Sequence, residues 1–224
     1  MAPLKVFGPL LSPNVTRVIL CLEEVDVEYE IVNVDFDTGE HKSPEHLQQS
    51  RAISRHVLRK YSVRPEDDTL DKCISRLVSC ILGQTEDKTS EVNLLREGNL
   101  EETALVDVWL DVEANQYEPT IAPIVYQLLL VPMNGGTPDQ KLIDDSLEKM
   151  KKVLDVYEAR LSKCKYLAGD FVSLADLSHF PYTVHFMATP FASVFDSYPR
   201  VKAWVQGLLS RPAAQRVISQ FPKY

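Results

Sequence analysis

The stretch LKVFGPLLSPNVTRVILCLEEVDVEYEIVNVDF, residues Leu4 to Phe36, decides the fold of the first part of the chain. Its first four residues are mostly apolar and precede a Gly-Pro pair, which predicts a short strand and a turn. Residues 13–24 predict a helix, and a second strand follows over roughly residues 27–36. The apolar face of that helix is formed by Val15, Val18, Ile19 and Leu22. This strand–helix–strand order with short loops predicts parallel strands joined by a right-handed crossover.

From about residue 93 onward, the sequence is typical of helices almost throughout. Residues 143–161 carry apolar side chains every three or four positions, which predicts one long packed helix. Capped helix starts are predicted at Asn99, Thr137 and Ser173, each followed three residues later by an acidic residue or a glutamine. The helix after Asn99 is expected to bury Leu105, Val106, Trp109 and Val112. The chain is therefore predicted to be an α/β domain followed by an all-α domain.

Composition excludes several classes of protein. The 224 residues carry a formal charge of −8 and a pI near 5.2, which argues against a nucleic-acid partner. The longest apolar stretch, around residues 121–133, is too short to span a bilayer, so no membrane partner is expected. The four cysteines are Cys21, Cys73, Cys80 and Cys164. Their spacing fits neither a metal site nor a Cys-x-x-Cys pair. We expect free thiols, a cytoplasmic location and no metal.

Ser12 is the polar residue at the predicted junction between the first strand and the first helix. The N–H groups and the dipole of a helix N-terminus favour an anion. A hydroxyl donor placed there can hold a thiolate and lower the pKa of the thiol. From spacing alone, the simpler explanation is that Ser12 only caps the helix and that Pro13 opens it. The two roles are compatible, because a hydroxyl can accept and donate at once.

Other candidate residues are weaker on their own. His41 and Lys42 can present cationic donors to a ligand carboxylate, although a solvated turn explains them better without further context. His179 and His185 fit packed or surface histidines better than ligands. The sequence contains no Gly-rich phosphate loop and no Gly-x-Ser-x-Gly elbow. Composition and spacing alone therefore leave the substrate open.

Residues 1–47, 50–61 and about 89–220 resemble plant phi-class glutathione transferases. The similarity includes the serine at the first helix start, the Glu-His-Lys turn, the Ser-Arg-Ala-Ile helix start and the capping box of "SLADLSHFPY". It implies a truncated thioredoxin-like glutathione-binding domain over residues 1–61 and an all-helical C-terminal glutathione-transferase domain over residues 89–224. Residues 62–88 are extra relative to the family and form an inserted linker. Their apolar spacing over 69–82 predicts either a docked helix or a disordered linker.

The resemblance also implies the site and the reaction. Glutathione is the expected co-substrate, Ser12 stabilises its thiolate, and a hydrophobic electrophile is the second substrate. The remaining glutathione contacts are implied at His41, Lys42, Gln49, Ser50 and Arg51. The candidate walls of the electrophile site are Leu11, Phe36, Tyr117 and Ile121, each of which fits an ordinary core residue equally well. The family also implies a homodimer.

One departure from the family leaves an alternative function open. Gln48 and Gln49 stand where the family usually carries two further strands and a cis-proline loop whose backbone pairs with glutathione. A sheet reduced to two strands is marginal unless another element covers it. The sequence is therefore also compatible with a catalytically impaired ligand-binding or scaffold protein. For the same reason we expect the dimer to be weak.

Overall fold

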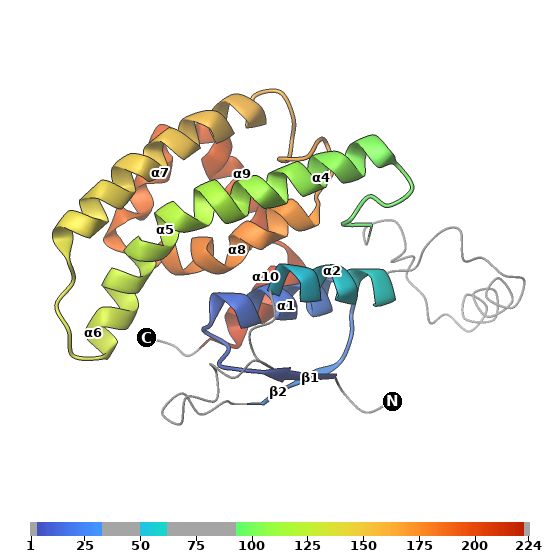
Figure 1. Cartoon of the computed structure of the whole chain (residues 1–224), viewed down its shortest axis with the longest axis horizontal. Helices are drawn as coiled ribbons and strands as arrows, with labels where there is room; N and C mark the ends of the chain where they lie inside the picture. Colours follow the sequence, from blue (N-terminus) through green and yellow to red (C-terminus); the bar gives the residue numbers. More distant parts are fainter. Residues whose placement is uncertain (1–3, 33–49, 62–92, 222–224) are drawn as a thin grey trace, which may run out of the picture.

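The computed structural model describes residues 4–32, 50–61 and 93–221 (Figure 1). In these residues, strands β1 (Leu4–Phe7) and β2 (Tyr29–Val32) pair in parallel, and α1 (Pro13–Glu24) connects them. The register places Leu4 opposite Tyr29. The predicted strand–helix–strand order is therefore present. The second strand begins two residues later than expected, and its expected end at residue 36 lies outside the described residues.

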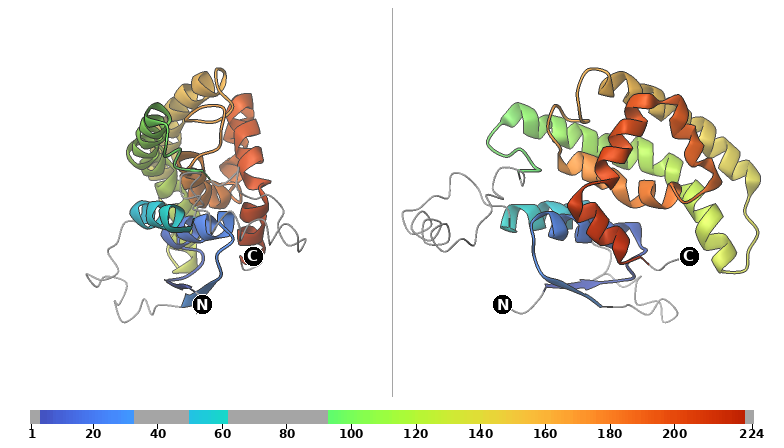
Figure 2. Two further views of the ribbon diagram at one scale, coloured as in Figure 1. Left: turned by 90° about the vertical axis from the view of Figure 1, so that its right-hand side faces the viewer. Right: turned by 180° about the vertical axis from the view of Figure 1, so that it is seen from behind.

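Helix α1 is the central element of the α/β region. All its side chains from Thr16 to Leu22 are buried, a wider face than the predicted stripe. It packs on α2 (Ser50–Tyr61) and on the helices α8 (Leu174–Phe186) and α10 (Pro212–Ser219) of the helical domain. Figure 1 shows α1, α2 and α10 as a layer between the sheet and the other helices, and Figure 2 shows this layer from behind. The first domain therefore shares its core with the second.

The helical domain begins with a long run of helical segments that includes two π-helical stretches. In order these are α4 (Leu100–Val112), η3 (Glu113–Tyr117, π), α5 (Glu118–Val125), η4 (Tyr126–Leu130, π) and α6 (Val131–Met133). The chain continues through α7 (Gln140–Leu161), α8, the 3₁₀ segment η5 (Pro190–Ser197), α9 (Pro199–Leu209) and α10. The predicted all-helical second domain is confirmed. π-helical segments are rare, and they occur frequently at functional sites.

Two details of the helical prediction are corrected. Helix α7 begins at Gln140, not at Pro138, because the side chain of Asp139 caps it by accepting from the Leu142 N–H at 3.1 Å. The backbone N–H of Asp139 donates in turn to Gln127 Oε1 at 2.8 Å, which fixes this start. In α4 Leu105 is exposed. The buried positions there are Val106, Trp109 and Leu110, so the core face lies about one position further along the helix.

The core of the helical domain contains a polar and aromatic cluster. The rings of Tyr117 and Tyr157 stack with centroids 5.8 Å apart, and the Tyr157 hydroxyl lies 2.9 Å from His179 Nε2. Asp176 is fully buried, and burial raises the pKa of its carboxyl group. Four donors reach its oxygens: the N–H and Oγ of Ser173 at 2.9 and 2.8 Å, and the Leu167 N–H and Trp204 Nε1 at 3.0 Å each. The predicted capping box of α8 is therefore part of a buried network.

Candidate functional site

The loop between β1 and α1 is held close to the helix it precedes. Gly8 has φ of +129°, and a Cβ there would lie 2.7 Å from Val15 Cγ2, so a side chain does not fit. The hydroxyl of Thr16 donates to the carbonyl of Leu10 at 2.6 Å. These contacts fix the path of residues 8–12 and hence the position of Ser12.

Ser12 is the N-cap of α1 by its backbone. Its φ and ψ of −69° and 123° are extended, and its carbonyl accepts from the Thr16 N–H at 2.9 Å. Its side chain makes no capping hydrogen bond, and the residue is partly exposed. The hydroxyl is therefore not used by the helix that it precedes. It stands at a helix N-terminus, whose dipole and first-turn N–H groups favour an anion.

Arg17 joins the Ser12 helix to the helical domain. Its guanidinium lies 3.2 Å from Glu113 Oε1, and both side chains are fully buried. It also pairs with Glu118 at 3.5 Å and donates to the carbonyl of Ser178 at 3.4 Å. Sequence reasoning missed this pair. The available signal was a charged residue within the apolar run of α1, but nothing in the sequence identifies Glu113 as its partner.

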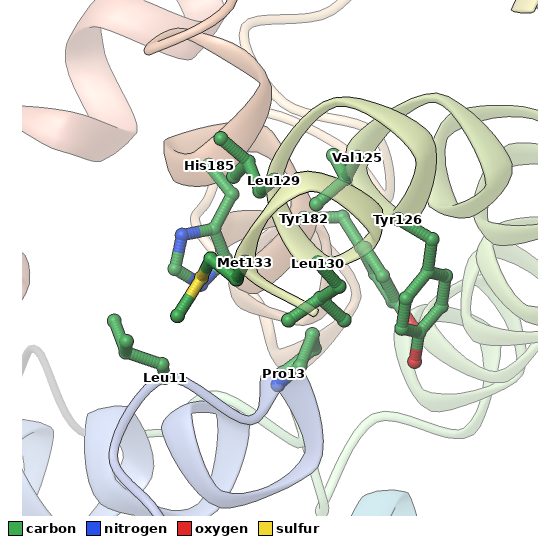
Figure 3. A pocket seen from close by; sticks show the side chains of 9 residues that line it. All are labelled: Leu11, Pro13, Val125, Tyr126, Leu129, Leu130, Met133, Tyr182 and His185. Carbon is green, nitrogen blue, oxygen red and sulfur yellow. The ribbon is translucent and has the colours of Figure 1, made fainter. Parts of the chain in front are cut away.

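A hollow of about 370 Å³, including space open to solvent, adjoins the Ser12 loop (Figure 3). Leu11 and Pro13, the two neighbours of Ser12, form its lower edge in Figure 3. The other walls come from the end of α5, the π-helical segment η4, α6 and α8. Their lining residues are Val125, Tyr126, Leu129, Leu130, Met133, Tyr182 and His185. The hollow is lined mainly by apolar side chains, as ligand sites usually are.

Three side chains bring polar atoms to this apolar hollow. Tyr182 is buried, and both burial and a hydrogen bond to Tyr126 raise the pKa of its hydroxyl. His185 is buried too, which lowers the pKa of its imidazole, while a backbone hydrogen bond to Leu11 acts in the opposite direction. These groups can orient a ligand whose main contacts are apolar.

The structure brings together only some of the predicted site residues. Leu11 lines the hollow beside Ser12. Tyr117 and Ile121, 1% and 0% exposed, lie in the helical core and not on the wall of this hollow. The Tyr117 hydroxyl is 2.7 Å from Thr183 Oγ1, inside that core. Both positions fit ordinary core residues, the alternative that the sequence leaves open, and their contact with a substrate stays a prediction.

The remaining predicted residues fall wholly or partly outside the described residues. Phe36, His41, Lys42 and Gln49 lie outside the described ranges, as do the inserted residues 62–88. Ser50 and Arg51 open α2, which packs on α1, but their side chains are not described. The described ranges 4–32, 50–61 and 93–221 hold no cluster of three or more metal-ligating side chains. No helix in the part of the chain that the structure describes is long and apolar enough to cross a membrane.

Sequence comparison identifies two family domains in this chain. The sequence model of the glutathione S-transferase N-terminal domain matches residues 2–54, and that of the C-terminal domain matches residues 118–212. The chain is 51% identical to the probable glutathione S-transferase GSTF1 of Oryza sativa subsp. japonica, over 97% of this chain and 96% of that protein. It is 52% identical to glutathione S-transferase 1 of Zea mays, with the same two coverages.

Solved structures show the same similarity. The structure of a glutathione S-transferase-I bound with lactoylglutathione superposes with a TM-score of 0.81 at 48% identity, covering 98% of this chain and all of that one. Glutathione S-transferase I from mais, in complex with an atrazine glutathione conjugate, gives a TM-score of 0.79 at 48% identity and covers 97% of each chain. The chain therefore belongs to the glutathione S-transferase family, among its plant phi-class members. The predicted pair of a thioredoxin-like and an all-helical domain is confirmed.

Proposed function

We propose that this protein is a glutathione S-transferase that joins the glutathione thiolate to hydrophobic electrophiles. The observation that carries the proposal is the apolar hollow beside Ser12, whose hydroxyl is not used to cap α1. The mais relative was solved with an atrazine glutathione conjugate, a product in which glutathione has been joined to another molecule. A site that places a thiolate next to an apolar hollow suits such a reaction.

In the proposed mechanism, the Ser12 hydroxyl donates a hydrogen bond to the glutathione sulfur at the N-terminus of α1. The hydrogen bond and the positive end of the helix dipole both favour the thiolate over the thiol. They therefore lower the pKa of the glutathione thiol from the ordinary thiol value of about 8.5. The thiolate then attacks the electrophilic carbon of a molecule held against Leu11 and the helical wall. A sulfur–carbon bond forms, and the electron pair moves onto the leaving group or the conjugated acceptor. The protein contributes proximity and thiolate activation.

The remaining glutathione contacts are proposed from the family resemblance. His41 and Lys42 would bind the glycine end of the tripeptide, and Ser50 and Arg51 would hold its γ-glutamyl end. Gln49, a further candidate contact, stands at the position of the family's glutamate. Ser50 begins α2. An anionic group bound there would lie at a helix N-terminus, where the backbone favours negative charge.

A second candidate function is a ligand-binding or scaffold protein with impaired catalysis. It is favoured by Gln48 and Gln49, which replace the proline loop that the family uses to pair with the glutathione backbone. Lost backbone hydrogen bonds weaken binding unless other donors replace them. The two functions differ in one measurable property, since only the enzyme requires glutathione binding.

We also propose that the protein is a cytoplasmic homodimer. Helix α4 exposes apolar side chains to solvent, including Leu100 at 90% and Val108 at 53%, which is typical of an interaction surface. Cys21 and Cys164 are free thiols, as expected of a reducing compartment. Sedimentation at micromolar and nanomolar concentration tests the dimer and its predicted weakness.

The decisive assay is glutathione conjugation by the wild-type protein and by Ser12→Ala, with Ser210→Ala as a matched control at the far end of α9. Removing a donor that stabilises developing or resident negative charge typically lowers turnover by about 100-fold to 1,000-fold. We expect this loss in Ser12→Ala and none in Ser210→Ala. Full turnover in Ser12→Ala would exclude the proposed role of the hydroxyl. Calorimetry that detects no glutathione binding to the wild-type protein would favour the scaffold function instead.

A further inference from the structure

We propose that His185 determines which second substrates this protein prefers, by binding a hydroxyl group on an aromatic ligand in the hollow. The inference rests on the proposed function, because it places the second substrate in the same hollow. His185 lies in the last turn of α8 and is 6% exposed. Its Nε2 is buried and makes no hydrogen bond of normal geometry among the described residues, while a backbone hydrogen bond to Leu11 acts on the same ring. A buried ring nitrogen in this state has lost its hydration without a replacement.

The imidazole is held in a fixed orientation at the wall of the hollow. Its ring stacks on that of Phe221, with centroids 5.4 Å apart and planes 19° apart. Figure 3 shows the ring beside Met133 and on the same side of the hollow as Leu11, the residue before Ser12. A ligand that hydrogen-bonds to His185 would therefore lie close to the proposed thiolate.

The other polar side chains of the hollow are already engaged with each other. The Tyr182 hydroxyl is hydrogen-bonded to Tyr126, which helps to raise its pKa. Among the side chains that line the hollow, His185 is the one with a buried polar atom that makes no hydrogen bond of normal geometry. The rest of the lining is apolar apart from these tyrosines. One polar contact in an apolar site fixes ligand orientation and gives specificity.

The chemistry of the ring indicates which ligand group fits. Burial lowers the pKa of His185, so the imidazole is neutral at neutral pH and carries one N–H donor and one acceptor nitrogen. A phenolic hydroxyl can donate to the acceptor nitrogen or accept from the N–H, so it matches Nε2 in either tautomer. The flat aromatic body of such a ligand suits the apolar walls formed by Leu129, Leu130 and Met133. We therefore assign hydroxylated aromatic electrophiles as the preferred class.

Binding of two unreactive probes, naphthalene and 2-naphthol, tests this assignment without requiring catalysis. The full-length wild-type protein, His185→Phe, His185→Gln and Tyr126→Phe are compared by calorimetry or quenching of ligand fluorescence. Phenylalanine keeps a planar ring against Phe221 but removes both nitrogens, whereas glutamine keeps a polar group near the position of Nε2. We expect the wild-type protein to prefer 2-naphthol, and His185→Phe to lose this preference by about threefold to tenfold, the usual effect of one hydrogen bond. The preference should persist in His185→Gln and Tyr126→Phe.

Two results would overturn the assignment. One is the same preference in the wild-type protein and in His185→Phe, which would mean that the histidine only packs. The other is that neither naphthalene nor 2-naphthol binds to the wild-type protein. A parallel assay of glutathione conjugation to 2-phenylethyl isothiocyanate and its 4-hydroxyphenyl counterpart separates the two proposals. If the binding preference depends on His185 but neither isothiocyanate is conjugated, His185 still selects the ligand of the hollow, whereas the proposed enzymatic function fails for these electrophiles.

Discussion

The interior of the helical domain and its boundary with the α/β region differ in how a buried carboxylate is stabilised. In the helical domain, Asp176 is satisfied by four neutral donors, all within that domain. At the boundary between the regions, buried Glu113 pairs with Arg17, which comes from α1. The Asp176 network is therefore complete within the helical domain, whereas Arg17 of α1 and Glu113 of η3 each take their charge partner from the other region. Ser12, which is proposed to activate glutathione, directly precedes α1. Its position therefore relies on the contacts between the two regions.

The largest predicted effect on stability concerns Asp176, in the interior of the helical domain. Asp176→Ala leaves four buried donors without an acceptor, and each unsatisfied group costs about 1–3 kcal/mol. We expect the free energy of unfolding to fall by about 4–6 kcal/mol, or the protein not to fold. Asp176→Asn retains one acceptor oxygen and should lose clearly less. Urea denaturation of the three proteins measures both effects, and near-equal stability of wild type and Asp176→Ala would contradict the description of this network.

The next effect tests the dependence of α1 on the helical domain. Arg17→Met leaves Glu113 buried beside an apolar side chain, and breaking a buried pair in this way costs about 3–5 kcal/mol. The double variant Arg17→Met/Glu113→Leu removes both charges and should recover much of that stability. Denaturation curves of the single and double variants measure the coupling. If the double variant is no more stable than Arg17→Met, charge pairing is not what joins the two regions.

A smaller effect concerns pH. Burial lowers the pKa of His185 in the folded protein below its ordinary value of about 6.5. The unfolded chain therefore binds more protons than the folded protein just below pH 6.5, so stability falls as the pH falls through this range. At pH 5.5 this histidine should account for at most about 1.4 kcal/mol of that loss. Denaturation at pH 7.5 and pH 5.5 should show a shallower pH dependence in His185→Phe than in the wild-type protein. Equal pH dependence in the two proteins would mean that His185 titrates normally.

The features that local patterns specify were predicted well. Strand β1, helix α1 and the long helix α7 follow from apolar spacing and turn residues, and the Ser173–Asp176 capping box is present as expected. The start of α7 was predicted wrongly because the contact of Asp139 with Gln127 is not local, and propensity alone favoured the earlier Thr-Pro pair.

The features that depend on distant residues were not predicted. Arg17 and Glu113 are almost one hundred positions apart, and no periodicity relates them. His185 reads as an ordinary packed histidine in the sequence, since only the fold shows that its ring borders a hollow beside Ser12. For Tyr117 and Ile121 the sequence leaves a substrate wall and the ordinary core equally open, and the structure places both side chains in the core.

The central claim is that the Ser12 hydroxyl acts on the glutathione thiol and not on its own helix. The direct measurement is a pH titration of thiolate absorbance for glutathione bound to the wild-type protein and to Ser12→Ala. We predict a thiol pKa well below the ordinary value of about 8.5 in the wild-type complex and a return toward that value in Ser12→Ala. Because the side chain makes no capping bond, the stability of the two proteins should agree within about 0.5 kcal/mol. An unchanged thiol pKa in Ser12→Ala would contradict the account.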